Sequence, residues 1–315
     1  MKAVTLRDYP RLPGEEDDAP RILRAIEDAP EGQLYIPADR YILGQPIIVK
    51  NRCSVEMQEM AVLEAAAEME FVLTWDGKPE DVNTRVGQSR NCFLKGGSID
   101  AKGFGSCLKL VNYWHFTLRD MTFLNGKIYG LCVGPDAGGV EIMADNLYFQ
   151  CTMGGLAGNK AISTNHTDSH YTDVIIVDYT IGVEDLCGGS NRYTRVHVWV
   201  GAVRDYVPNS INYVLKGKTE EYGEILLRDC YADTGKIGFD IYTNVRLLGC
   251  AYYNNYSWIG LDDVLCIRNN TTKPVLVADG FFTQTSPKAT FYQGVPGDKI
   301  IFRDNIFRGG LSQDG

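Results

Sequence analysis

The sequence predicts an all-β fold, a single-stranded parallel β-helix in which short strands stack coil upon coil. An eight-residue pattern of alternating apolar residues, with a polar bend residue at its fifth position, recurs between Phe116 and Phe307. The 33 Gly, 18 Tyr and only 12 Pro in 315 residues suit many short strands joined by tight turns. One such strand cannot bury its inner face alone, so we expect the coils to stack in register around a shared core.

The first expected element is a short helix that caps the N-terminal end of the solenoid. Residues 19–29 have their apolar side chains on one face, and Asp17 or Asp18 can cap the start of that helix. The exposed end of a solenoid needs such a cover. Residues 33–49 then supply two strands, whereas residues 54–70 fit either a helix or stacked strands.

The repeated octets come next, and each is too short for a helix, so each reads as a strand that runs into a bend. Asp, Asn and Gly suit such a bend, and their side chains or backbone satisfy the turn. We therefore expect a structural ladder down one corner, formed by Asp120, Asn146, Asp178, His197, Asp229, Gly249, Asp279 and Asp304. We expect one domain over 1–315, with the cap and first strands in 1–50 and regular coils in 91–310.

Charge and composition exclude several classes of protein. Forty acidic against thirty-one basic residues give a net charge of −9, which argues against a nucleic-acid partner. The sequence has no run of 18 apolar residues and no apolar segment typical of a signal peptide near Met1, so we expect no membrane partner and a cytoplasmic location. The nine cysteines lack metal-ligand spacing and are expected to be reduced, buried thiols, with no metal site.

Two specific segments carry a resemblance to a known superfamily. The order of a capping helix, YIPADRYIL from Tyr35, GGSIDAKG from Gly96 and then repeated bent strands resembles the pectate-lyase-like superfamily. It is most similar to bacterial and phage proteins related to the polygalacturonase family. The resemblance implies a right-handed β-helix over most of the chain. That scaffold carries hydrolases, lyases, epimerases and non-catalytic spikes, so the resemblance leaves the activity open.

The densest polar cluster lies in residues 165–173. In an extended segment His166, Asp168 and His170 point to the same side, and Asp173 follows at the start of an apolar strand. Such a row can hold a sugar, relay a proton or bind a divalent ion, and the alternative is an ordinary polar connection between coils. Asp168, His170 and Asp173 are therefore candidate catalytic residues, and His166 is a candidate for substrate binding.

The following coil offers a second group of acids, Glu184 and Asp185, with Arg195 nearby as a substrate-binding candidate. Glycoside hydrolysis uses two carboxyl groups about 5.5 to 9.5 Å apart. Coils of a β-helix lie about 4.8 Å apart, so acids on adjacent or next-adjacent coils fall in this range. The alternative is that both acids are solvated loop charges.

Asp262 and Asp263 form a third group of candidate catalytic acids. They resemble the paired-Asp motif of the polygalacturonase family, and the alternative is a solvated acidic turn. Asn165 and Asp168 loosely resemble the Asn-Thr-Asp motif of the same family. In that family the two motifs lie on consecutive coils, whereas about ninety residues separate them here. Aromatic side chains offer flat surfaces to sugar rings, so we add as substrate-binding candidates Trp199, Tyr242, Tyr256 and Trp258.

These patterns predict a carbohydrate-active enzyme, a glycoside hydrolase or transglycosylase that uses Asp/Glu acid–base chemistry and no cofactor. A polysaccharide lyase is the first alternative; it would need a cation, such as Ca²⁺, and a base such as Lys216, Lys218, Arg204 or Arg195. The second alternative is a non-catalytic spike of a phage or prophage particle, which would bind glycans as a homotrimer. All three readings imply a carbohydrate partner.

Overall fold

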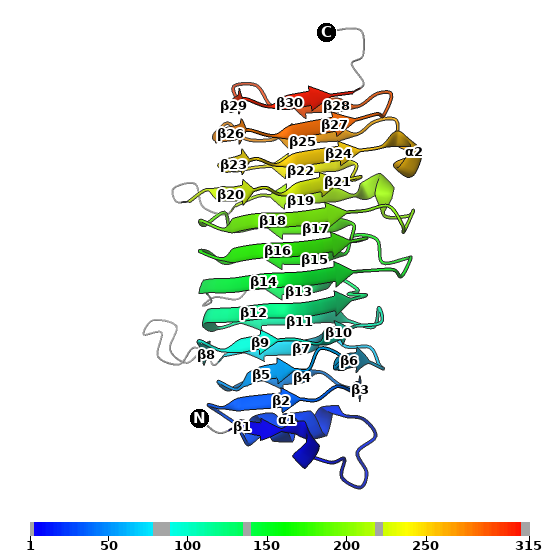
Figure 1. The fold of residues 1–315 in the computed structure, drawn as a ribbon, viewed down its shortest axis with the longest axis vertical. Helices are drawn as coiled ribbons and strands as arrows, with labels where there is room; N and C mark the ends of the chain where they lie inside the picture. Colours follow the sequence, from blue (N-terminus) through cyan, green and yellow to red (C-terminus); the bar gives the residue numbers. More distant parts are fainter. Residues whose placement is uncertain (1–2, 78–88, 135–139, 218–222, 310–315) are drawn as a thin grey trace. The chain divides into compact units, whose positions relative to one another are not determined.

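The computed structural model describes residues 3–77, 89–134, 140–217 and 223–309, and they form an all-β solenoid. Every strand pairing given for these residues is parallel, which confirms the predicted fold class. The chain divides into two compact units, residues 1–150 and 151–315. Each unit holds strands of two sheets: sheet A contains the bent strands, and sheet B contains the straight strands between them (Figure 1).

The first unit begins with the predicted cap, helix α1 (Ala19–Glu27). Ile22 and Ile26 are among its buried residues, and Figure 1 shows the helix beside the first strands. Asp17 Oδ1 accepts the N–H of Ala19 at 2.7 Å and so caps the helix start. Asp18 occupies the N-cap position itself, but its carboxylate makes no capping hydrogen bond and pairs with Arg11, 2.7 Å between Oδ2 and Nη2.

Residues 33–49 form three strands and not the expected two, because the chain turns again before Ile47, and residues 54–70 contain two further strands and no helix. Alternate residues of this segment are buried, as in Val62–Ala65, so it fits a pleated strand and not a helix. Sheet B contains β4 (Ile47–Val49), β7 (Phe71–Asp76), β11 (Ser106–Val111) and β13 (Tyr129–Val133). Sheet A contains β1 (Ala3–Thr5), β2 (Gln33–Ile36), β3 (Arg40–Leu43), β5 (Ser54–Met57), β6 (Val62–Ala65), β8 (Ser89–Arg90), β9 (Phe93–Lys95), β10 (Ser98–Asp100), β12 (Tyr113–Leu124) and β14 (Val140–Gln150).

The second unit repeats the same coil. Its sheet B contains β15 (Lys160–Thr164), β17 (Ile181–Asp185), β19 (Ile211–Leu215), β22 (Ile237–Ile241), β25 (Leu265–Asn269) and β28 (Thr290–Gln293). Its sheet A contains β16 (His170–Val177), β18 (Arg192–Trp199), β20 (Ile225–Arg228), β21 (Tyr231–Asp233), β23 (Val245–Leu248), β24 (Ala251–Asn254), β26 (Pro274–Ala278), β27 (Phe281–Gln284), β29 (Lys299–Arg303) and β30 (Ile306–Arg308). The described loops of this unit contain two short helices, the 3₁₀ helix η3 (Val207–Asn209) and α2 (Tyr256–Ile259).

The bend ladder of sheet A is largely as predicted, with two errors of register. The confirmed bend residues all have left-handed φ between +52° and +63°: Asp120, Asn146, Asp229, Gly249, Asp279 and Asp304. In β16 and β18, however, Thr172 lies opposite Thr194 and Val174 opposite Val196, so the bend residues are Asp173 and Arg195. Both have left-handed φ, +53° and +52°.

Asp178 and His197, predicted for those two positions, were therefore misassigned. Asp178 lies at the corner after β16, where its Oδ1 accepts the N–H of Gly201 at 2.9 Å. His197 lies within β18, opposite Tyr231, and the two rings stack with centroids 4.6 Å apart. The apolar run after Asp173 extends to Val177. The polar fifth position of the octet can therefore be aligned with either Asp173 or Asp178, and the sequence pattern alone favours Asp178, which is the wrong alignment.

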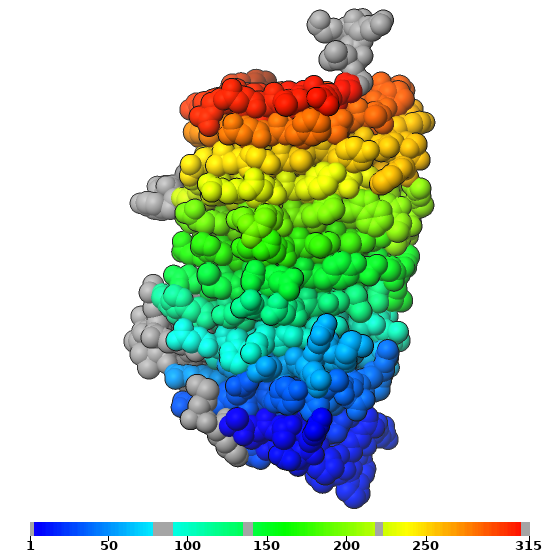
Figure 2. All heavy atoms as spheres, in the orientation of Figure 1, coloured from blue at the N-terminus to red at the C-terminus, as the bar shows by residue number. Residues whose placement is uncertain are grey.

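The interior of the second unit is filled by aligned side chains that stack from coil to coil. Tyr171 stacks on Tyr193 at 5.0 Å, and Tyr213 on Phe239 at 5.1 Å. Figure 2 shows successive coils of this unit, from green to red, as layers in direct contact. All nine cysteines are buried and none is joined in a disulfide, in line with the expected reduced thiols. Within the described ranges, no helix has the length and apolar character needed to cross a membrane.

Candidate functional site

The outer face of sheet B in the second unit carries two parallel rows of side chains. The strand register stacks one residue from each strand into a mostly polar row: Ser163, Glu184, Val214, Asp240, Arg268 and Gln293. Three residues earlier on each of four central strands, the same register forms a half-buried apolar row: Ile181, Ile211, Ile237 and Leu265. A flat surface with one apolar and one polar edge results.

Glu184 is the first buried carboxylate of the polar row, with 6% of its side chain exposed. Its Oε2 accepts from Lys160 Nζ at 2.7 Å and from Ser163 Oγ at 2.9 Å, both on the preceding strand. Its Oε1 lies 3.8 Å from Nζ of Lys216, just beyond the next strand. Two ammonium groups thus hold one carboxylate against the sheet.

Asp240 is the second buried carboxylate, with 2% of its side chain exposed. Arg268 on the next strand binds it in a bidentate pair, with Nε 2.8 Å from Oδ1 and Nη2 2.5 Å from Oδ2. Asn270 Nδ2 donates to Oδ1 at 2.8 Å, and the hydroxyl of Tyr242 donates to Oδ2 at 3.1 Å. The hydrogen bond to Asp240 raises the pKa of Arg268, and burial together with the same carboxylate raises the pKa of Tyr242.

The two carboxylates are separated along the row by Val214 alone. Neighbouring strands lie about 4.8 Å apart, so two steps place the backbones of Glu184 and Asp240 roughly 9.6 Å apart. Both carboxylates are almost fully buried, so the charged groups of the row that a ligand can reach are their partly exposed partners Lys216 and Arg268.

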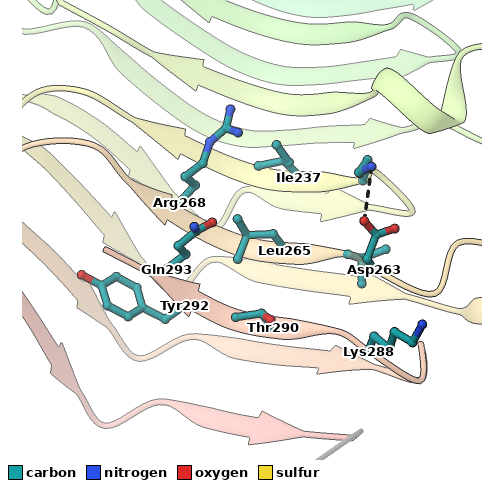
Figure 3. Close-up of a pocket in the computed structure, with 10 residues that line it drawn as sticks. Ile237, Asp263, Leu265, Arg268, Lys288, Thr290, Tyr292 and Gln293 are labelled. Atoms are coloured by element: carbon teal, nitrogen blue, oxygen red, sulfur yellow. Dashed lines mark ion pairs between the residues drawn. The ribbon is translucent and has the colours of Figure 1, made fainter. Parts of the chain in front are cut away.

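A hollow of about 460 Å³ continues the face over the last coils (Figure 3). Arg268 and Gln293 line one end, and Asp263 and Lys288 line the other. Ile237, Leu265 and Thr290 are among the residues between these ends. The dashed line in Figure 3 marks the ion pair of Asp263 with Lys236, 3.5 Å between Oδ2 and Nζ.

Basic side chains outnumber acidic ones in the lining of the hollow, where Lys236, Arg268 and Lys288 face Asp263. The acidic groups described above are Glu184, Asp240 and Asp263, whereas the basic groups are Lys160, Lys216, Lys236, Arg268 and Lys288. The chain as a whole carries a net charge of −9. A local surplus of positive charge against that background favours an anionic ligand at this face.

Asp185, a candidate next to Glu184, faces the interior and has no exposed surface. Its Oδ1 accepts the N–H groups of Cys187 and Gly188, each at 3.0 Å, and its Oδ2 accepts from Asn191 Nδ2 at 3.0 Å and from the Tyr193 hydroxyl at 2.9 Å. Burial raises its pKa. The side chain anchors the loop that borders Glu184.

The cluster in residues 165–173 is not gathered into one row. Asp168 has a left-handed φ of +58°, which breaks the extended segment, and His166 is buried whereas Asp168 and His170 are exposed. The prediction that these three side chains share one side is therefore wrong. Asp173 and Arg195 lie on sheet A, where they form an ion pair, 2.5 Å between Oδ1 and Nε, which lowers the pKa of Asp173.

The remaining candidates lie on loops and strand ends of the second unit. Asp262 precedes Asp263 in the exposed loop before β25, and its carbonyl accepts the N–H of Lys288 at 2.9 Å. Tyr256 and Trp258 are exposed on α2. Trp258 and Trp199, which ends β18, line a smaller hollow of about 190 Å³. Of the lysines considered as lyase bases, Lys218 lies outside the described residues.

Sequence reasoning missed four residues of the polar row and its surroundings: Lys160, Ser163, Asp240 and Arg268. Their signal was present in the short segments KAIST, IGVED, INYVL, IGFDI and LCIRN, one before each bent strand. Aligned by their apolar third residues, these segments place Ser, Glu, Val, Asp and Arg in one column. In the described residues, no group of three or more His, Cys, Asp or Glu side chains is arranged to hold a metal ion.

No protein-family model and no curated protein match this chain. Among solved structures, the A-module of a mannuronan C-5 epimerase from Azotobacter vinelandii is similar with a TM-score of 0.65 and 11% identity, over 98% of this chain and 96% of that one. An endo-xylogalacturonan hydrolase from Aspergillus tubingensis has a TM-score of 0.65 at 12% identity, over 98% and 93%. A tailspike protein of E. coli bacteriophage HK620, in complex with a hexasaccharide, has a TM-score of 0.65 at 12% identity, over 96% and 65%. At these identities the likeness shows the shared β-helix fold.

Proposed function

We propose that the outer face of sheet B in residues 151–315 binds an acidic glycan. The observation that carries this proposal is the surplus of lysine and arginine around the hollow of that face, in a chain with a net charge of −9. Arg268 and Lys216 are each partly exposed, so their remaining donors are accessible to carboxylate groups of a ligand.

The rest of the face suits a sugar chain in its chemistry. The half-buried apolar row, Ile181 to Leu265, offers a surface to the C–H faces of pyranose rings. At the end of the polar row, the side-chain amide of Gln293 and the guanidinium of Arg268 line the hollow and can hydrogen-bond to sugar hydroxyls. The similar solved structures add support, because their names give mannuronan, xylogalacturonan and a bound hexasaccharide as the glycans concerned.

Hydrolysis of the bound glycan is the second candidate function, and the spacing of Glu184 and Asp240 favours it. Inverting glycoside hydrolases hold their two carboxyl groups about 6.5–9.5 Å apart, and two coil steps place the backbones of Glu184 and Asp240 close to the upper end of that range, roughly 9.6 Å apart. Both carboxylates are paired with cations, however, whereas hydrolysis needs one of them to carry a proton. Binding is therefore the function that the geometry supports best.

The binding proposal is tested by titrating the protein with hexagalacturonate and with uncharged galactohexaose in a calorimeter. We expect hexagalacturonate to bind more tightly, and Lys216→Gln to weaken it by about tenfold. Lys299→Gln is the matched control, because Lys299 is exposed on sheet A. Equal affinity for both sugars, or equal losses in the two variants, would contradict the proposal.

Turnover is tested on the same two sugars by following new reducing ends together with the ultraviolet absorbance of unsaturated products. New reducing ends without ultraviolet absorbance would support hydrolysis. This activity should be lost in Glu184→Gln and Asp240→Asn and retained in Glu224→Gln. Glu224 is a suitable control because it pairs with Arg246 at sheet A. Absorbance would support a lyase, and binding without either signal would leave glycan recognition as the function.

A further inference from the structure

A second hollow lies away from the sheet B rows, where two loops of the second unit meet. It has a volume of about 190 Å³. One loop follows β18 and the other contains α2. The lining consists of two indoles, a guanidinium, two hydroxyl side chains and two small residues: Trp199, Trp258, Arg204, Thr234, Ser257, Gly201 and Ala202.

The first loop is held in place by the corner residue Asp178. Its Oδ1 accepts the backbone N–H groups of Gly201, Ala202 and Val203 at 2.9, 3.0 and 3.3 Å. The N–H of Val200 donates to the Thr234 hydroxyl at 3.3 Å. These bonds fix the segment directly after Trp199, so this wall is formed before any ligand arrives.

The second loop is fixed by helix α2. Asn255 caps it by accepting from the N–H of Ser257 at 3.0 Å, and Gly260 ends it with a left-handed φ of +69°. Ile259 is buried in a small apolar cluster with Val200, Val207 and Val264. Its neighbour Trp258 therefore faces outward with 53% of its surface exposed.

Arg204 joins the two loops by donating from Nη1 to the carbonyl oxygen of Trp258. The guanidinium is thereby positioned at the rim of the hollow, and its other N–H groups can donate to a ligand. A cationic ligand is disfavoured beside it. A ligand with an apolar face and several hydroxyl or carboxylate oxygens fits both the indoles and Arg204.

We propose that this hollow, the tryptophan pocket, binds a single pyranose ring and is a second sugar site, separate from the sheet B rows. The ring would stack on Trp258 and Trp199, and Arg204 would hydrogen-bond its oxygens. This proposal does not require the sheet B face to bind glycan, because the pocket contains none of the residues of the two rows.

The test uses the full chain, with hexagalacturonate and galactohexaose as probes and saturation-transfer NMR and calorimetry as readouts. We expect at least one probe to bind the pocket, and Trp258→Ala to weaken that binding by about tenfold while Trp258→Phe retains most of it. Trp114→Ala is the matched control, because Trp114 is a partly exposed tryptophan of the first unit.

Arg204→Gln identifies what the guanidinium recognises. If Arg204→Gln weakens the binding of hexagalacturonate alone, the guanidinium recognises a carboxylate of the sugar. If it weakens the binding of both probes equally, the guanidinium recognises sugar hydroxyl groups. Glu184→Gln and Lys216→Gln should leave the Trp258-dependent binding unchanged. The second site is overturned if Trp258→Ala binds both probes as the wild type does, or if neither probe binds. If sheet B variants alone remove binding, the proposed function stands without the tryptophan pocket.

Discussion

The second unit contains two Asp–Arg pairs of nearly the same geometry in different surroundings. Asp173 and Arg195 meet on sheet A, with Nε–Oδ1 and Nη2–Oδ2 distances of 2.5 and 2.7 Å. Asp240 and Arg268 meet on sheet B, with corresponding distances of 2.8 and 2.5 Å. The sheet A aspartate is 46% exposed, whereas the sheet B aspartate is 2% exposed.

The difference lies in what surrounds each pair. Asp173 is a bend residue of the coil, and its partly exposed carboxylate pairs with the partly exposed guanidinium of Arg195. Asp240 lies within a strand, and Tyr242 and Asn270 add two further donors to it. Thus an Asp–Arg pair between neighbouring strands is a surface contact on sheet A and part of a buried polar network on sheet B.

The largest effect should come from breaking the buried pair. Arg268→Ala leaves the carboxylate of Asp240 buried with two neutral donors, so we expect a loss of about 3 kcal/mol in the free energy of unfolding. Urea denaturation measures this loss. A change below about 1 kcal/mol would mean that the pair behaves like an exposed one and that the burial of Asp240 has no energetic consequence.

A smaller loss is expected at Asp185. Asp185→Ala leaves the N–H groups of Cys187 and Gly188 and the hydroxyl of Tyr193 without their acceptor, at a cost of about 2 kcal/mol. Retention of full stability in this variant would show that water replaces the carboxylate.

Asp185 also predicts a pH dependence. Its pKa is raised in the folded state, so its charged form is disfavoured there. We compare the free energy of unfolding of the wild type with that of Asp185→Asn. The wild type should lose stability relative to the variant as pH rises from 3.8, the ordinary pKa, to the raised pKa of the folded state, and the difference should not change below pH 3.8. Denaturation of both proteins across that interval measures the difference, and parallel curves would contradict the assignment.

The smallest effect is expected at the exposed pair. Arg195→Ala should cost at most about 1 kcal/mol, and added salt should reduce that cost. The pair lowers the pKa of Asp173, so its contribution is present above the ordinary pKa of 3.8 and is lost as pH falls through the lowered one. A loss as large as that of Arg268→Ala, measured in the same urea titration, would remove the contrast between the two pairs.

The coil could be predicted from the sequence because each octet contains the residue pattern of a strand followed by a bend, and the same pattern recurs in the neighbouring octets. The prediction failed where one octet can be aligned in two ways, as at Asp173 and Asp178, because only pairing with the next coil selects the alignment. The same limit hid the site. Glu184 stood out as an acid, but Asp240 became a partner only when the register placed it two strands away on the same face. Composition could not distinguish the inward Asp185 from the outward Glu184.

The most direct test of the account is hydrogen–deuterium exchange with and without hexagalacturonate, because it compares both sheets in one experiment. We predict slower exchange in the sheet B strands β17, β19, β22 and β25 and in the loops beside them, with no change at the sheet A bend residues Asp173, Arg195 and Asp229. Slower exchange at the sheet A bends, with sheet B unchanged, would contradict the assignment of the glycan-binding face to sheet B.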